Sequence, residues 1–280
     1  MRTIDANEIT KEVKRMVIEA NYYLPKDVME ALQKAKEEDD WNLSKDILDK
    51  IVQNAEVASQ DQVPMCQDTG MAVVFVEMGQ EVVIENGYIE DAINEGIRQG
   101  YSEGLLRKSV VNDPLNRENT KDNTPGIINY SIVPGDKLGI QIAAKGFGSE
   151  NMSRLKMLKP AEGLQGVKDF ILETVELAGP NACPPIVVGV GLGGSFDKVT
   201  LLAKKALMRD LDDYNENPYY ADLEKELLEE INELGIGPQG FGGKTTALKV
   251  ALEYYPTHIA GLPIAVNINC HATRHKEVII

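Results

Sequence analysis

Three cysteines are the residues of this chain whose type and spacing could do chemistry. They stand at Cys66, Cys183 and Cys270, separated by 117 (183 − 66) and 87 (270 − 183) residues. Each lies among turn-forming residues, in the stretches PMCQDTG, GPNACPP and NINCHATRH. A thiolate can be a nucleophile or a ligand for zinc or iron. Whether the three thiols meet in the fold therefore decides which chemistry is open to the chain.

The spacing disfavours two of these chemistries. Zinc sites usually contain a close pair such as C-x-x-C, and no such pair is present. A nucleophile needs one thiol, not three in similar settings. A four-iron cluster is usually held by four thiolates, so three would leave one iron open to act as a Lewis acid. Three buried structural thiols remain the alternative.

Strands are predicted next to each of the cysteines. The apolar run 71–78 follows the loop of Cys66, a short Ile/Val strand follows Cys183, and a last strand precedes Cys270. Every cysteine thus lies at a boundary between strand and loop, and none belongs to a helix stripe. Structural cysteines have no reason to avoid helices, so this placement favours a site.

The remaining elements indicate an α+β fold. We expect one domain over 1–280, with a helical layer (1–60) on a small, mostly antiparallel sheet whose loops carry the cysteines. The polar segment 110–125 is expected to be a functional or disordered loop. Further helices are predicted at 88–102, 164–177, 198–211 and 219–234. A hairpin is predicted from 127–133 and 137–144, and a restarted helix within GIGPQGFGGKTTALKVAL.

Composition bounds the classes of partner. The formal net charge is −15, so the chain has no electrostatic footprint for nucleic acid or an anionic membrane. No signal peptide or membrane span is visible, and three cysteines are too few for a disulfide framework. These features predict a cytoplasmic protein in a reducing compartment.

Two glycine-rich motifs imitate nucleotide sites. Gly189, Gly191 and Gly194 fit the dinucleotide pattern, but no second strand ending in an acidic residue follows within the required distance. The stretch GFGGKTT resembles a phosphate loop, yet Pro238 occupies the position of its first glycine. Both clusters are instead expected to allow a close backbone approach.

Long motifs give the chain a family resemblance. PMCQDTG, GPNACPP, GVGLGGSFDKVTLLAKKAL, GPQGFGGKTTAL and HIAGLPIAVNINC together resemble the class I, iron–sulfur-dependent fumarate hydratases and the related L(+)-tartrate dehydratases. The resemblance covers nearly the whole chain. Because the sequence ends ten residues after Cys270, it is similar to the alpha subunit of the two-subunit members.

The resemblance implies a cofactor and its ligands. Cys66, Cys183 and Cys270 would hold a [4Fe–4S] cluster with three protein ligands and one open iron. Gln67 and Asp68 match positions that face the substrate, with Asp68 as a proton donor. From the residues alone, Asp68 could equally be an Asx-turn residue of its own loop.

Three further positions match the family pattern. Arg107 corresponds to an arginine that binds a substrate carboxylate, and Gly148 to a glycine whose amide reaches the substrate. His258 corresponds to a histidine of the pocket, expected to assist proton movement. Without the family, Arg107 would read as a solvated cation and His258 as a structural residue. No role is assigned to His271, Arg274 and His275.

The expected function is the reversible addition of water to a C4 dicarboxylate, interconverting malate and fumarate. A beta subunit would complete the site, and a higher homo- or hetero-oligomer is expected, with no nucleic acid and no membrane as partners. The alternatives are an L(+)-tartrate dehydratase alpha subunit and a non-catalytic iron–sulfur scaffold or electron-transfer subunit.

Overall fold

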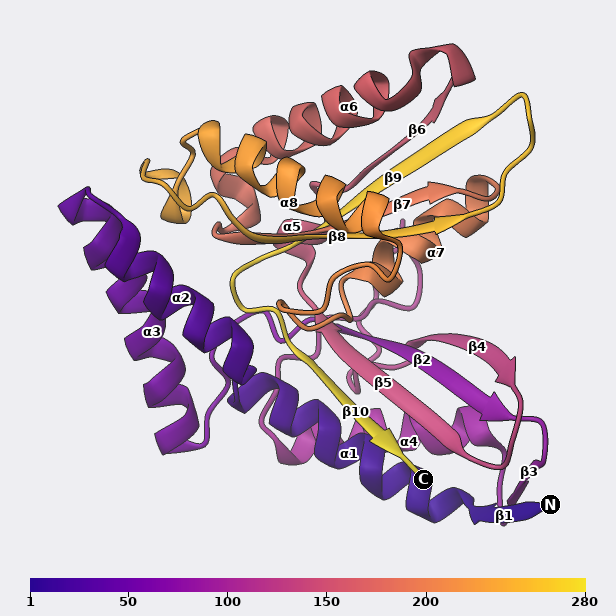
Figure 1. Cartoon of the computed structure of the whole chain (residues 1–280). Helices are drawn as coiled ribbons and strands as arrows, with labels where there is room; N and C mark the ends of the chain where they lie inside the picture. Colours follow the sequence, from indigo (N-terminus) through magenta and orange to yellow (C-terminus); the bar gives the residue numbers. More distant parts are fainter. The chain divides into compact units, whose positions relative to one another are not determined.

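A computed structural model describes all 280 residues, and the chain divides into two compact units (Figure 1). Unit 1 comprises Met1–Leu24, Asn54–Phe147 and Arg274–Ile280, and unit 2 comprises Pro25–Gln53 and Gly148–Thr273. Each unit has its own four-stranded sheet and its own hydrophobic core. The helices expected at the N-terminus are therefore divided between the two units.

Unit 1 is a sheet with the strand order β10-β5-β2-β4, together with a parallel pair of β1 and β3. Helices α1 and α4 pack against each other, and α1 also contacts β5 and β10. Their apolar stripes, with Val13 and Ile97 fully buried, form the core with inward residues of β2 and β5. Its elements are β1 (Arg2–Asp5), α1 (Ala6–Tyr22), β2 (Met71–Gly79), β3 (Val82–Glu85), α4 (Ile89–Glu103), β4 (Ile127–Val133), β5 (Leu138–Lys145) and β10 (His275–Ile279).

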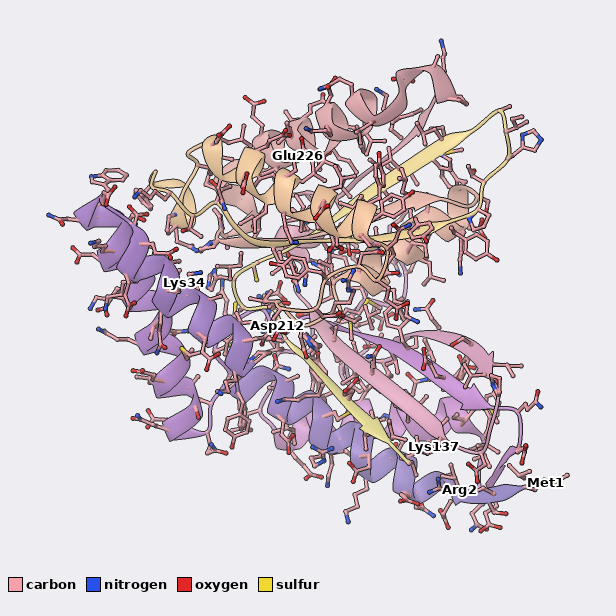
Figure 2. The ribbon with its side chains drawn as sticks, in the orientation of Figure 1. Met1, Arg2, Lys34, Lys137, Asp212 and Glu226 are labelled. Atoms are coloured by element: carbon pink, nitrogen blue, oxygen red, sulfur yellow. The ribbon has the colours of Figure 1, made fainter.

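The expected hairpin of β4 and β5 is wrong, because β2 lies between these strands. β2 pairs in parallel with β4 and antiparallel with β5. Gly79, at the end of β2, reaches into the turn that joins them, and a Cβ there would lie 2.5 Å from the carbonyl oxygen of Gly135. Figure 2 labels Lys137 in this turn. The turn between β4 and β5 is present as predicted, but β2, which is distant in sequence, lies between the two strands that the turn connects.

Unit 2 is a sheet with the order β6-β9-β7-β8, with helices on both faces (Figure 1). Helices α6 and α8 share the larger core with Val188 and Val190 of β7, while α7 packs on the other face. Its elements are α2 (Lys26–Glu38), β6 (Arg154–Leu158), α6 (Gly163–Ala178), β7 (Ile186–Gly193), α7 (Phe196–Ala206), α8 (Pro218–Glu233), β8 (Ala247–Tyr255) and β9 (Leu262–Asn269). Two helices, α3 (Asn42–Asp61) and the short α5 (Phe147–Glu150), contain a unit boundary.

The glycines of β7 let α7 lie directly on the strand. Side chains alternate along a strand, so Val188 and Val190 face α6 and α8 while Gly189 and Gly191 face α7. A Cβ on Gly191 would lie 2.1 Å from the carbonyl oxygen of Val199 in α7. These glycines of the dinucleotide-like motif therefore serve helix packing.

The α+β prediction is confirmed, and four of the seven strand pairings are antiparallel. The predicted strand at 71–78 and the helices at 88–102, 164–177 and 219–234 are present within a few residues. The restarted helix after GFGGKTT is wrong, because Ala247–Tyr255 forms β8 beside β7. Strands β1, β3, β6 and β10 were not predicted.

Candidate active site

Two of the three cysteines lie at the same end of the unit 2 sheet. Cys183 precedes β7 and Cys270 directly follows β9. These strands are antiparallel, with Val187 opposite Asn269, so the start of β7 lies beside the end of β9. The strand pairing thus places side by side two cysteine-bearing segments that are 87 residues apart in the sequence (270 − 183).

The segments that carry these two cysteines are also hydrogen-bonded to each other. The backbone N–H of His271 donates to the carbonyl oxygen of Cys183 over 3.4 Å, and His271 Nδ1 lies 2.9 Å from the same oxygen. Cys183 has φ 54° and ψ 62°, a left-handed conformation that is uncommon for a residue with a side chain. Both thiols are partly exposed, and neither forms a disulfide.

Gly148 lies near the same turn. A Cβ on Gly148 would come within 3.8 Å of the carbonyl oxygen of Asn181, two residues before Cys183. The structure therefore places Gly148 beside the turn that carries Cys183.

His258 lies at the other end of the sheet. It occupies the exposed turn between β8 and β9, beside the end of β7, where Thr257 Oγ1 donates to the carbonyl oxygen of Gly194 over 2.9 Å. From Val187 to Gly194 the strand advances on the order of 20 Å, at about 3.3 Å per residue. The structure does not bring His258 together with Cys183 and Cys270 of its own chain.

In unit 1, Cys66 and its neighbours form a loop that is fixed by hydrogen bonds on both sides of the cysteine. The N–H of Met65 donates to the carbonyl oxygen of Asn21 over 3.0 Å. Both carboxylate oxygens of Asp68 accept backbone hydrogen bonds, from Gly70 N–H over 3.0 Å and from Phe147 N–H over 2.8 Å. Asp68 does form the Asx turn within its own loop, and it also holds the segment that leads into Gly148.

Arg107 is linked to this loop through its backbone. Thr69 Oγ1 donates to the carbonyl oxygen of Arg107 over 3.1 Å, while the Arg107 side chain is exposed. The unit 1 part of the predicted site, comprising Cys66, Gln67, Asp68 and Arg107, is therefore contiguous.

Arg274, to which the sequence gives no role, contacts the loop that carries Cys66 and Asp68. Its Nη2 donates to the backbone oxygen of Asp68 over 2.8 Å, and Nη1 donates to Oδ1 of Asn21 over 3.0 Å. An arginine four residues after the last cysteine gave no local signal, because its partners lie more than 200 residues earlier.

Asn123 and Tyr101 were also missed. Asn123 is fully buried, accepts hydrogen bonds from Ser109 and Val110, and donates to the carbonyl oxygen of Gly70 over 3.2 Å. Tyr101 donates to the same oxygen over 3.0 Å, and burial raises its pKa far above the ordinary value, so it remains a donor. The segment 110–125 is thus an ordered loop anchored on the Cys66 segment.

The donor chemistry fits an iron–sulfur group in part. All three cysteines are free and partly exposed, as thiolate ligands require. No group of three or more His, Cys, Asp or Glu side chains converges as a metal site in the structure. Ligation by the two thiols of unit 2 has a geometric basis in their adjacent strand ends, and the third ligand, Cys66, rests on the resemblance.

Two cavities in unit 2 lie away from these cysteines. One of about 250 Å³ is mainly apolar and includes Leu164 and Tyr220. The other, of about 420 Å³, includes Lys34 of α2 and Asp212 of the segment after α7, both labelled in Figure 2. None of the helices is both long and apolar enough to cross a membrane.

Comparison with known proteins identifies the family. Residues 10–279 match the family described as fumarate hydratase (fumerase). A Methanocaldococcus jannaschii protein, provisionally named L(+)-tartrate dehydratase subunit alpha, is 45% identical over 273 residues, 95% of each chain. The L(+)-tartrate dehydratase subunit alpha of Escherichia coli O157:H7 is 31% identical over 278 residues, 98% of this chain and 91% of that protein. The chain therefore belongs to the fumarate hydratase family.

Proposed function

We propose that this chain is the alpha subunit of a [4Fe–4S] hydro-lyase that interconverts malate and fumarate by reversible addition of water. The observation that carries the proposal is the position of Cys183 and Cys270 just outside adjacent ends of the paired strands β7 and β9, in a member of the fumarate hydratase family. Such a reaction would place the enzyme in the tricarboxylic acid cycle.

In this proposal Cys66, Cys183 and Cys270 are the three protein ligands of the cluster. When bound, the cluster would supply an open iron that acts as a Lewis acid on the substrate. The residues of the chain would then have to bind the carboxylates and move the proton.

We assign these tasks to residues beside the cysteines. Arg107, with an exposed guanidinium, would bind a substrate carboxylate through two parallel N–H donors. The backbone amide of Gly148 and the side chain of Gln67 would orient the substrate. Asp68, fixed by two backbone hydrogen bonds, would hold the proton that leaves with the hydroxyl group.

A beta subunit is proposed as the partner that completes the site. The relatives named above are alpha subunits by name. In the family pattern, the base for the carbon-bound proton and further cationic carboxylate ligands come from the second subunit. The chain alone is therefore expected to turn over little or no substrate.

L(+)-tartrate dehydration is the second candidate. The specific observation in its favour is that the relatives at 45% and 31% identity carry that name. Tartrate differs from malate by one hydroxyl group, so the reaction class and the proposed ligands are the same.

Reconstitution tests the proposal and separates the candidates. The chain and its beta partner are loaded anaerobically with iron and sulfide, and malate, fumarate and tartrate are added separately. We expect turnover of malate and fumarate, abolished by Cys183→Ser. Turnover of tartrate alone would select the second candidate. A protein that stays colourless after loading contradicts the cluster, and a coloured one that turns over none of the three substrates is a scaffold or electron carrier.

A further inference from the structure

The backbone of Cys183 is held in an unfavourable conformation by its surroundings. With φ 54°, it lies in the left-handed region, where the Cβ of a non-glycine residue is crowded. Such a conformation persists only where neighbouring groups determine it. The N–H of Cys183 donates to the carbonyl oxygen of Pro180 over 3.0 Å, but this single turn bond does not fix the direction of the chain beyond it.

Two residues distant in sequence occupy the carbonyl groups that follow. The Cys183 carbonyl oxygen accepts from the backbone N–H of His271, and Nδ1 of the His271 ring lies 2.9 Å from the same oxygen. The Pro184 carbonyl oxygen accepts twice from Gln239, through the backbone N–H over 2.7 Å and through Nε2 over 2.8 Å. Since Pro184 and Pro185 have no N–H, these carbonyls are the polar groups by which the turn can be held. Each of the two carbonyl oxygens therefore lies against one backbone group and one side-chain group of a distant residue.

The His271 ring faces two polar groups at this turn. Its Nδ1 lies 2.9 Å from the Cys183 carbonyl oxygen, which only accepts, and 3.2 Å from Nε2 of Gln239. With a hydrogen on Nδ1 the ring donates to the Cys183 carbonyl, while Gln239 Nε2 donates to the Pro184 carbonyl.

Gln239 belongs to the 237–243 loop, which is built to press against the cysteine turn. Gln239 itself has φ 53°, so it is a second strained residue, and it is hydrogen-bonded to Pro184, the residue after Cys183. A Cβ on Gly240 would lie 2.4 Å from Cβ of Pro180, so only glycine allows this approach. On the other side, Gly242 lies against the ring of Trp41, where a Cβ would come within 2.5 Å.

The same loop is anchored to the turn between α2 and α3. Oδ2 of Asp39, a residue only 1% exposed, accepts from the N–H of Lys244 over 2.9 Å and from Ser44 Oγ over 2.7 Å. The motif that resembles a phosphate loop thus packs between the α2–α3 turn and the cysteine turn, and Gln239 forms its hydrogen bonds to the cysteine turn.

We propose that Gln239 and His271 are positioning residues for the thiol of Cys183. They hold its turn in the strained geometry and, because His271 follows Cys270, they set the separation of the two thiols. The role of this clamp toward the cluster rests on the proposed function. Its effect on the thiol itself does not, since the contacts exist without any cofactor.

The variants are chosen to remove one donor at a time. His271→Ala removes the ring, while His271→Asn offers an N–H near the position of Nδ1 and is the rescue variant. Gln239→Glu keeps the shape but places a carboxylate against the Pro184 carbonyl. Gln165→Glu, an exposed position on α6, is the control for the added charge.

The first readout uses the metal-free chain. Alkylation of Cys183 by iodoacetamide is followed by mass spectrometry, with Cys66 of the other unit as an internal reference. We expect His271→Ala and Gln239→Glu to raise the Cys183 rate at least tenfold and leave the Cys66 rate unchanged, because a released turn exposes its thiol more often. His271→Asn should return the rate toward that of the parent. Parental Cys183 rates in both clamp variants would overturn the proposal.

The second readout uses the loaded complex with its beta partner. Loss of visible absorbance after addition of an iron chelator should be about ten- to hundredfold faster in His271→Ala and Gln239→Glu. In His271→Asn and Gln165→Glu the absorbance should be lost at the rate of the parent. Equal rates in all variants would contradict the role toward the cluster. A parent protein that stays colourless after loading would instead refute the proposed function. The alkylation rates of the metal-free chain would still test whether Gln239 and His271 position Cys183. If His271→Ala fails to fold, the alkylation rate and the rate of absorbance loss are compared in Gln239→Glu and His271→Asn.

Discussion

The carboxylate of Asp68 connects two segments of unit 1 through backbone donors. Asparagine at this position could accept from Gly70 N–H, but its amide would then face Phe147 N–H, donor against donor. We expect Asp68→Asn to lower kcat of the loaded complex at least about 100-fold, because a general acid is lost. The free energy of unfolding should fall by about 1–2 kcal/mol.

Steady-state kinetics and urea unfolding check this expectation. Asp136→Asn, on an exposed turn of the same unit, is the control and should change neither quantity. An Asp68→Asn enzyme with parental kcat would remove Asp68 from the proposed chemistry and leave it only its Asx turn.

At this scale the sequence predicts residues that carry a local signal. Cys66 and Asp68 stand out because turn residues surround them, and Arg107 because the family pattern marks it. Arg274 and Asn123 could not be found in this way. Their importance lies in hydrogen bonds to backbone groups of Asp68 and Gly70, and the fold alone creates those contacts.

Among the elements, the contact of β7 with α7 depends on the absence of side chains. Gly191→Ala would place a Cβ against backbone at 2.1 Å, which no side-chain rotation relieves. We expect a loss of at least about 3 kcal/mol in the free energy of unfolding, the upper end of overpacking costs. Gly139→Ala on β5 is the matched control, because its Cβ would meet ordinary contacts, the nearest at 3.6 Å.

Urea unfolding of the two variants compares them directly. Gly139→Ala should remain within about 0.5 kcal/mol of the parent, as for substitutions away from strained or crowded sites. If Gly191→Ala were equally mild, α7 would have to move away from β7 at little cost, and the packing argument would be wrong.

Element types followed from periodicity where the pattern was long. The stripes of α4, α6 and α8 match the 3.6-residue period and were predicted. β8 was misread because Ala247, Val250 and Ala251 fit a helix face and a buried strand equally well. The insertion of β2 between β4 and β5 had no local signature, because Val73 and its partner Ile127 are 54 residues apart (127 − 73) and such a pairing is decided by the whole core.

For the whole molecule, the position of His258 restricts how it can act. It lies at the end of the unit 2 sheet opposite Cys183 and Cys270, so in the proposed site it can assist only in a second copy of the chain. We expect a mixture of the Cys183→Ser and His258→Asn chains, each inactive with the beta partner, to regain activity. In mixed dimers, one site would have both an intact cluster ligand and an intact histidine.

Random exchange of subunits would make half of the dimers mixed, with one competent site in each. The mixture should therefore reach roughly a quarter of parental activity per chain, measured after co-refolding and loading. Activity that never exceeds the sum of the separate variants would exclude a shared site. Parental activity in His258→Asn alone would exclude the histidine from the reaction.

The strand β10 has a consequence for how the protein is made. It pairs with β5 at residues such as Val278 and Ile140, yet all of Gly148–Thr273 is translated between these strands. During synthesis, the edge of β5 that pairs with β10 therefore stays unpaired while unit 2 is being made. Open edges template pairing with other chains. Until β10 has been made, the edge of β5 is therefore open to pairing with another chain.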